Sequence, residues 1–234
     1  MRLIHGRSEI ELHELRAGEG LPLLLLHELG GGARQWQLGE FETWPGPVYA
    51  LDFAGHGASD HLKGGGYFPE YFLADADHAL SAMSSAGECA VIGAGIGGYV
   101  ALLLSGARRE RIPAAMLLPG RGLAGGGLLP DWKNRTYTNL DEWDAHTAAC
   151  AAEYLPATDP MVASCERDIR PEPYLAEFAA AARRLILSEA IGSDGDRPAW
   201  WHLATRAATS QITSNNFGKA LSALRLACNE ENAA

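Results

Sequence analysis

The chain has 234 residues, with 29 acidic residues against 19 basic ones and a formal net charge of -10. That length suits one domain with a large buried core. The negative charge repels phosphate backbones and anionic lipids, so we expect neither a nucleic-acid nor a membrane partner. We expect a cytoplasmic location, because the first residues lack the apolar core of a signal peptide and no apolar run approaches the length of a membrane span.

The first half of the chain alternates apolar runs of strand length with glycine-rich turns. Residues 20–26 form a continuous apolar run, which is typical of a central strand in a parallel sheet covered on both faces. This run leads directly into the loop His27-Glu-Leu-Gly-Gly-Gly32. After a helical stretch, residues 48–52 predict a second strand, which the loop Phe53-Ala-Gly-His-Gly-Ala-Ser-Asp60 follows.

Residues 89–104 indicate a third buried strand, a tight glycine turn and a helix. The turn Gly93-Ala-Gly-Ile-Gly97 has the frame of Gly-x-Ser-x-Gly, in which the central serine is a nucleophile, but its central residue is Gly95. Glycine tolerates the positive φ that such a turn imposes on its central residue. We therefore expect a relaxed elbow without a nucleophile.

The same glycines also fit the dinucleotide-binding fingerprint Gly-x-Gly-x-x-Gly over residues 93–98. That fingerprint needs an acidic residue at the end of the next strand, predicted over residues 114–118. Pro119, Gly120 and Arg121 stand there instead. A protein that binds FAD or NAD(P) through residues 93–98 is the weaker alternative, and our first expectation is no cofactor.

The three loops together resemble the α/β-hydrolase family. Its members carry a His-Gly-x-x-Gly-type oxyanion loop, an Asp-x-x-Gly-His-Gly-x-Ser loop and a nucleophile elbow in this order and at comparable intervals. The resemblance implies a single α/β-hydrolase domain over residues 1–234, with a mostly parallel central sheet flanked by helices. It also implies a short helical lid within residues 128–160. The four cysteines are scattered without a Cys-x-x-Cys pair, so no metal site is expected.

One amphipathic helix is predicted within the lid. Asn139 with Glu142 three residues later gives an N-terminal cap signature. Leu140, Trp143, Thr147, Ala151 and Tyr154 then recur at helical spacing. Trp132 and Trp143 are expected to face a ligand, and the alternative is that the aromatic side chains attach the helix to the domain.

The resemblance also locates the other two members of a catalytic triad. Residues 161–165 are predicted to form a short strand, and in the family the acid follows this strand, which makes Asp168 the matching residue. Residues 184–190 are predicted to form the last strand, after which relatives show Gly-His-x-Pro. This chain has Gly195-Asp-Arg-Pro198, so Asp196 stands in the place of the histidine. The nearest imidazole, His202, is an alternative base.

These substitutions decide the predicted chemistry. Gly95 supplies no nucleophile and Asp196 no imidazole, so acyl-enzyme chemistry is expected to be absent. The loops still offer ligand-binding candidates, which are His27, Glu28, Leu29 and Ile96. For His27 the alternative is a hydrogen-bonded histidine at a strand end.

The sequence thus predicts a non-hydrolytic protein that binds a small, partly apolar molecule between sheet and lid. A divergent enzyme is the alternative, either a hydrolase or a lyase. In that enzyme Asp168 or Asp196 would activate water or take a proton, with Glu28 as a further carboxylate. The oligomeric state is left open.

Overall fold

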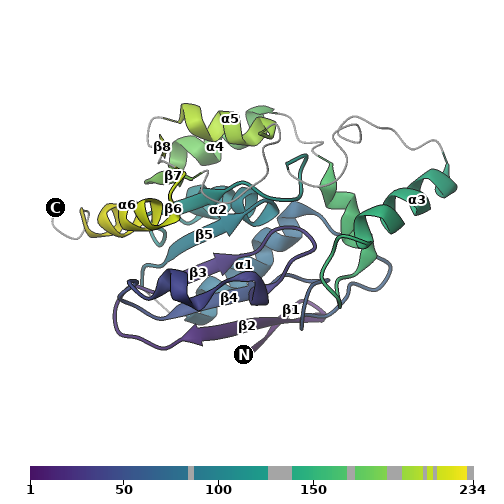
Figure 1. Cartoon of the computed structure of the whole chain (residues 1–234), viewed down its shortest axis with the longest axis horizontal. Helices are drawn as coiled ribbons and strands as arrows, with labels where there is room; N and C mark the ends of the chain where they lie inside the picture. The colour runs from purple at the N-terminus through teal and green to yellow at the C-terminus, as the bar shows by residue number, and fades with distance from the viewer. Residues whose placement is uncertain are drawn as a thin grey trace.

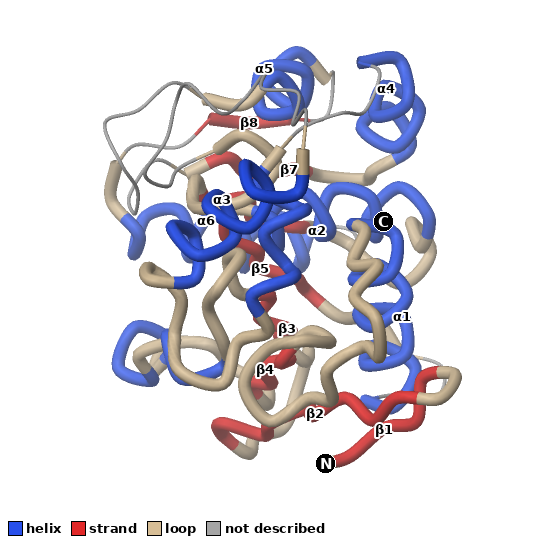
Figure 2. The backbone as a smooth tube through the Cα atoms, turned by 90° about the vertical axis from the view of Figure 1, so that its right-hand side faces the viewer, coloured by secondary structure: helices blue, strands red, loops and turns tan. Residues whose placement is uncertain are grey.

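The computed structural model describes residues 1–83, 87–125, 139–167, 172–188, 197–207, 210–212 and 215–230. Within them lies one eight-stranded sheet with the order β1-β2-β4-β3-β5-β6-β7-β8. The β1–β2 and β2–β4 pairs are antiparallel, and every later pair is parallel. Figure 2 shows β1 and β2 at one end of the sheet and β8 at the other. The predicted mostly parallel sheet is confirmed.

From β4 to β6 the strands alternate with α-helices along the chain. The strands are β1 (Arg2–His5), β2 (Ser8–Arg16), β3 (Leu23–Leu26), β4 (Val48–Asp52), β5 (Ala90–Ala94), β6 (Ala115–Leu118), β7 (Leu185–Leu187) and β8 (Ser210–Ile212). The α-helices are α1 (Pro69–Met83), α2 (Ile96–Ala107), α3 (Leu140–Ala151), α4 (Glu172–Ala181), α5 (Ala199–Arg206) and α6 (Phe217–Glu230). Short 3-10 helices are η1 (Ala33–Gln35), η2 (Leu38–Phe41) and η4 (Pro160–Glu166).

Helices cover both faces of the sheet, which explains the run of leucines in β3. Leu24 and Leu26 pack into the core under α1, α2 and α4, whereas Leu23 and Leu25 pack on the opposite face with residues of α6. All four leucines are fully buried, as predicted for a central parallel strand. In Figure 1, α3 lies on the side toward which the parallel strands point, and α6 lies on the other side. No helix among the described residues is both long and apolar enough to cross a bilayer.

One predicted strand was wrong, and another is present but is not the last strand. Residues 161–165 belong to the 3-10 helix η4, because Pro160 occupies its first turn and the Asp159 side chain accepts a hydrogen bond from Met161 N at 3.0 Å. The strand predicted over residues 184–190 is β7, but it is not the last strand. β8 pairs with its outer edge, and this polar three-residue segment gives too weak an apolar pattern to be recognised.

The carboxylate of Asp52 joins the loops that follow β3 and β4. Its Oδ1 accepts a hydrogen bond from Ala33 N at 2.7 Å, and its Oδ2 accepts one from Ala58 N at 3.0 Å. His13 Nε2 lies 2.9 Å from the same Oδ2. Burial raises the pKa of Asp52, but the amide hydrogen bonds from Ala33 and Ala58 and the contact with His13 outweigh burial and hold that pKa below its usual value.

We expect Asp52→Ala to lower the free energy of unfolding by about 2–4 kcal/mol, because the buried amide of Ala33 loses its acceptor and the partly buried amide of Ala58 loses a charged partner. Urea denaturation at neutral pH measures the loss. The control is Asp77→Ala. Asp77 pairs with Arg108 at 2.6 Å, with side chains 30% and 45% exposed, so its removal should cost about 1 kcal/mol or less. Equal losses in the two variants would contradict this role of Asp52.

Candidate functional site at the elbow

The predicted strand, turn and helix around Gly95 are present. β5 ends at Ala94, Gly95 has φ 54° and ψ -122°, and α2 begins at Ile96. The positive φ is the conformation that the elbow spacing predicts, and a residue with a side chain would adopt it only under strain. The turn is therefore formed in this chain, but its central residue carries no reactive group.

The space above Gly95 is filled by the main chain of Arg121. A Cβ atom placed on Gly95 would overlap the carbonyl oxygen of Arg121 and would lie 2.7 Å from its amide nitrogen. A serine at this position would thus collide with backbone atoms, which cannot move aside as a flexible side chain can.

The carbonyl oxygen of Arg121 accepts two converging hydrogen bonds. Leu29 N donates at 3.1 Å and Ile96 N donates at 2.9 Å. Leu29 lies in the loop after β3, and Ile96 directly follows the elbow residue. In enzymes with a nucleophile elbow, the amides at these two places form the oxyanion hole. In this chain the carbonyl oxygen of Arg121 lies between these two amides.

Glu28 holds the amide of the same residue. Its Oε2 accepts a hydrogen bond from Arg121 N at 2.8 Å, and its Oε1 accepts one from Gln35 Nε2 at 3.1 Å. Of the predicted ligand-binding residues, Glu28, Leu29 and Ile96 thus meet at one place, around the main chain of Arg121. We call residues 119–125, which follow β6 and contain Arg121, the strap.

The far end of the strap has an unusual backbone conformation. Leu123 has φ 49° and Ala124 has φ 59°, values that residues with a side chain rarely adopt. Leu123 N donates to Cys165 O at 2.7 Å, and Ala124 N donates to Glu166 O. The strap is therefore held between the elbow and the end of η4 at the expense of two disfavoured residues.

The Arg121 side chain connects the strap to the lid. Its Nη1 donates to Glu153 O at 3.0 Å, and its Nη2 lies 3.4 Å from Glu153 Oε2. The guanidinium carbon lies 5.6 Å from the centre of the Tyr154 ring, within the range of a cation–π contact. Sequence reasoning noticed Arg121 only as the residue that replaces a nucleotide-binding acid.

Glu166 is a carboxylate of this site, 14% exposed, that the sequence did not single out. Its Oε1 accepts a hydrogen bond from Tyr154 Oη at 2.9 Å and lies 4.0 Å from Arg121 Nε. Burial raises the pKa of Glu166 to about 7, an effect that Glu28 strengthens and that Tyr154 and Arg121 oppose. The nearest sequence signal was the acidic cluster of residues 166–168, from which Asp168 was chosen.

Two buried histidines fix the loops that carry the oxyanion amides. His27 Nδ1 donates to Glu28 O at 2.7 Å, and His27 Nε2 accepts from Phe53 N at 3.1 Å. His56 Nε2 accepts from Gly30 N at 3.1 Å, so this ring joins the two loops. Burial lowers the pKa of both rings, which are neutral in these contacts. The contacts of His27 are those of a hydrogen-bonded histidine at a strand end.

The lid helix starts where predicted, and its buried side agrees with the predicted one in part: Tyr154 is buried and Ala151 packs against the core, but Leu140 does not. α3 begins after Asn139, whose Oδ1 accepts from Glu142 N at 2.9 Å. Leu140, expected on the apolar face, is 78% exposed, and His146 and Cys150 are buried instead. The helix is turned so that a polar pair, and not the leucine, faces the domain.

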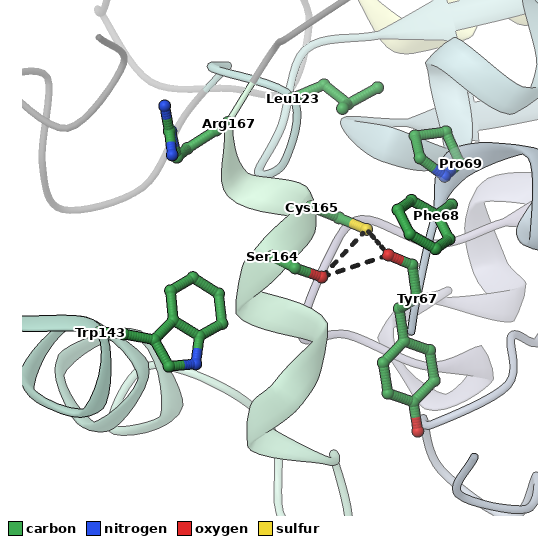
Figure 3. Close-up of a pocket in the computed structure, with 8 residues that line it drawn as sticks. All are labelled: Tyr67, Phe68, Pro69, Leu123, Trp143, Ser164, Cys165 and Arg167. Atoms are coloured by element: carbon green, nitrogen blue, oxygen red, sulfur yellow. Dashed lines mark hydrogen bonds between the residues drawn. The ribbon is translucent and has the colours of Figure 1, made fainter. Parts of the chain in front are cut away.

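A pocket of about 190 Å³ lies between the lid and the domain. Figure 3 shows Trp143 on one side of η4 and Phe68, Pro69 and Leu123 on the other. We call this cavity the lid pocket. Arg167 is a charged residue of its lining, and Leu123 brings the strap into its wall. On η4, Ser164 Oγ and Cys165 Sγ lie 3.2 and 3.4 Å from Tyr67 O.

Of the remaining predicted site residues, the structure describes only His202. Trp132, Asp168 and Asp196 lie outside the described residues. His202 lies on α5 with an exposed side chain, next to the buried Trp201. Within the described ranges, no group of three histidine, cysteine or carboxylate side chains could hold a metal ion.

Comparison with known proteins identifies the architecture. Neither the models of known protein families nor the curated proteins searched match the sequence. A hydrolase from Pseudomonas aeruginosa superposes with a TM-score of 0.70 at 18% identity, over 96% of this chain and 97% of that one. The chain has the α/β-hydrolase fold. The predicted fold and the resemblance on which it rested are thereby confirmed.

Two further solved structures of this fold differ in their described activities. A thioesterase domain from the curacin biosynthetic pathway superposes with a TM-score of 0.62 at 16% identity, over 100% of this chain and 98% of that one. The bottromycin epimerase BotH, solved with bottromycin A2, superposes with a TM-score of 0.59 at 17% identity, over 95% of this chain and 94% of that one. At such identities the likeness shows the α/β-hydrolase fold alone.

We expect Gly95→Ala to lower the free energy of unfolding by about 3 kcal/mol or more, because the added Cβ strains the backbone and overlaps the strap. Calorimetric melting measures the effect. Gly39→Ala is the matched control, since a Cβ there meets nothing within 4 Å, and it should leave the melting temperature nearly unchanged. An undisturbed melting temperature for Gly95→Ala would show that the strap does not cover the elbow.

Glu166 should make stability depend on pH. Its folded pKa of about 7 lies above the unfolded value of 4.5, so the native state holds a proton that the unfolded chain releases between these values. Its contribution to stability therefore falls as the pH rises from about 4.5 to 7.

The free energy of unfolding of Glu166→Gln minus that of the wild type should thus be higher at pH 8 than at pH 5, by on the order of 2–3 kcal/mol. Urea denaturation at the two pH values measures this difference. A difference that is the same at both pH values would contradict the raised pKa.

Proposed function

We propose that this chain is a non-hydrolytic α/β-hydrolase-fold protein that binds a small, partly apolar molecule beneath its lid. One observation carries the proposal, namely that the carbonyl of Arg121 accepts hydrogen bonds from both oxyanion amides, Leu29 N and Ile96 N. The same main chain fills the space of a nucleophile side chain at Gly95. Hydrolysis through this elbow lacks both an attacking group and a free position for the substrate oxygen.

The missing base supports the same proposal. Residues 161–165 are not a strand, and β8 follows β7 in the sheet. The family order of loops therefore moves the position of the acid from Asp168 to the segment after β7, where Asp194 and Asp196 stand in the sequence. It then puts the histidine after β8, where Thr213 begins the segment Thr-Ser-Asn-Asn. His202 is the last histidine of the chain, so this assignment also leaves the triad without an imidazole. Loss of a nucleophile or base costs on the order of a millionfold in kcat in serine proteases.

The lid pocket is the proposed ligand site. It holds about 190 Å³, which is smaller than the 300–1,000 Å³ typical of drug-sized ligands and suits a single ring or a short acyl chain. Its walls include Trp143, as proposed from the sequence, with Phe68 and Leu123 opposite. An apolar cavity with few polar groups is the usual form of a small-molecule site.

A divergent enzyme is the second candidate, and Glu166 favours it. A carboxylate with a pKa of about 7 exchanges protons near neutral pH, and it lies beside Arg121. In this scheme Glu166 joins Asp168, Asp196 and Glu28 as a carboxylate that takes a proton without a serine. The fold neighbour named as an epimerase is an example of a non-hydrolytic reaction. The dinucleotide alternative is less favoured, because the Ile96 amide is already bound to Arg121 O.

We expect no burst of p-nitrophenol and no hydrolysis above background when the protein is mixed with p-nitrophenyl acetate, butyrate or octanoate. The reason is that neither a nucleophile nor a free oxyanion hole is present. Release of p-nitrophenol is followed by stopped-flow absorbance at pH 7.5, with protein and ester at equal concentration. Glu166→Gln is assayed in parallel. Hydrolysis by the wild type that this variant loses would refute the proposal and favour the carboxylate enzyme.

A further inference from the structure

We infer that displacement of the strap opens a cleft over Gly95, and that this cleft recognises an N-acylated α-amino carbonyl compound, such as an N-acyl amino acid amide or a peptide, of which the strap is an internal mimic. This inference rests on the proposed non-hydrolytic function and names the ligand class. The recognised unit is a tetrahedral carbon atom that carries an N–H donor on one side and a C=O acceptor on the other.

Three hydrogen bonds to one residue define this recognition. Arg121 presents its C=O to Leu29 N and Ile96 N, at 3.1 and 2.9 Å. It presents its N–H to Glu28 Oε2, at 2.8 Å. The cleft thus offers two donors to a carbonyl and a charged acceptor to the amide on the other side of the same carbon. A simple ester or acid would satisfy only the two donors.

The glycine at the elbow makes room for such a unit. A Cβ on Gly95 would overlap Arg121 O and lie 2.7 Å from Arg121 N, so both polar groups of the bound residue sit directly above the elbow. A side chain at position 95 and a main-chain-like ligand exclude each other. Gly95 is therefore a requirement of this recognition as well as the loss of a nucleophile.

The recognising groups are held in place independently of the strap. Gln35 Nε2 donates to Glu28 Oε1 at 3.1 Å, and Gln35 Oε1 accepts from Gly32 N at 3.1 Å. His27 and His56 fix the loop that carries Leu29. A cleft whose donors and acceptor keep their positions when it is vacated loses little conformational entropy on binding a ligand.

The strap is held by contacts that a ligand can replace. Its main-chain hydrogen bonds to Glu28, Leu29 and Ile96 are those that the ligand would make. Release would relieve the disfavoured conformations of Leu123 and Ala124. The remaining attachments are the Arg121 side chain, through Glu153 and Tyr154, and the amides of Leu123 and Ala124, which donate to Cys165 O and Glu166 O. Because the ligand would take the position of Arg121, its side chain would replace the Arg121 side chain beside the Tyr154 ring.

The probe is N-acetyl-L-leucine methylamide, titrated calorimetrically into the full chain. The comparison compound is the analogue in which an ester oxygen replaces the acetylated N–H. We expect the amide to bind about tenfold or more tightly than the ester analogue, because only the amide donates to Glu28. Arg121→Ala should bind the amide about tenfold more tightly than the wild type, since it weakens the competing strap. Arg108→Ala, which removes a remote surface pair with Asp77, should bind like the wild type.

Variants of Glu28 provide a second test. Glu28→Leu should abolish the preference for the amide over the ester, and Glu28→Gln, which keeps an acceptor oxygen, should retain part of it. Glu153→Ala removes the 3.4 Å contact of Arg121 Nη2 with Glu153 Oε2 but keeps the hydrogen bond to Glu153 O, so it loosens the strap less than Arg121→Ala does and replaces that variant if it does not fold.

Equal affinity for amide and ester, or no binding of the amide to the wild type and to the loosened variants, would overturn this inference. Neither result would contradict the proposed non-hydrolytic function. Hydrolysis of p-nitrophenyl esters by the wild type would refute that function.

Discussion

The carbonyl of Arg121, held by the amides of Leu29 and Ile96, is the contact on which the arrangement of the site depends. It links the loop after β3, the elbow after β5 and the strap after β6 at one oxygen atom. The carboxyl ends of parallel strands converge at such an edge, which is where α/β proteins bind ligands. Here the chain itself supplies the bound group, so the architecture of a hydrolase is retained around an occupied centre.

The charge arrangement follows from that contact. With the Arg121 amide on Glu28 and its guanidinium beside Glu153 and Glu166, one residue lies among three carboxylates at the junction of lid and domain. The guanidinium favours ionised Glu166, but burial prevails and leaves its pKa near 7. The site therefore combines two loop amides that are already hydrogen-bonded to Arg121 O with a carboxylate whose pKa is about 7.

The elements set by local pattern were predictable from the sequence, and the strap was not. The buried leucines of β3, the elbow at Gly95 and the cap at Asn139 each depend on a few adjacent residues. The contacts of Arg121 depend on loops far apart in the chain, which no spacing reveals.

The errors in prediction have the same cause. β8 is short and polar, so it is recognised only through its pairing with β7. Residues 161–165 have an apolar composition that suits a strand, but Asp159 and Pro160 start a helical turn there. The exposure of Leu140 likewise reflects how α3 docks, since His146 and Cys150 on another face of the helix are buried against the domain.

The path of the strap has a consequence for cooperativity. A single residue bonds to the two loops at its backbone and to the lid at its side chain, so the lid cannot move away without pulling on the elbow. Hydrogen exchange at the amides of Leu29 and Ile96 would then report lid opening from a distance, although neither residue belongs to the lid. The lid and the sheet edge would then open together as one cooperative unit, with a single free energy of opening.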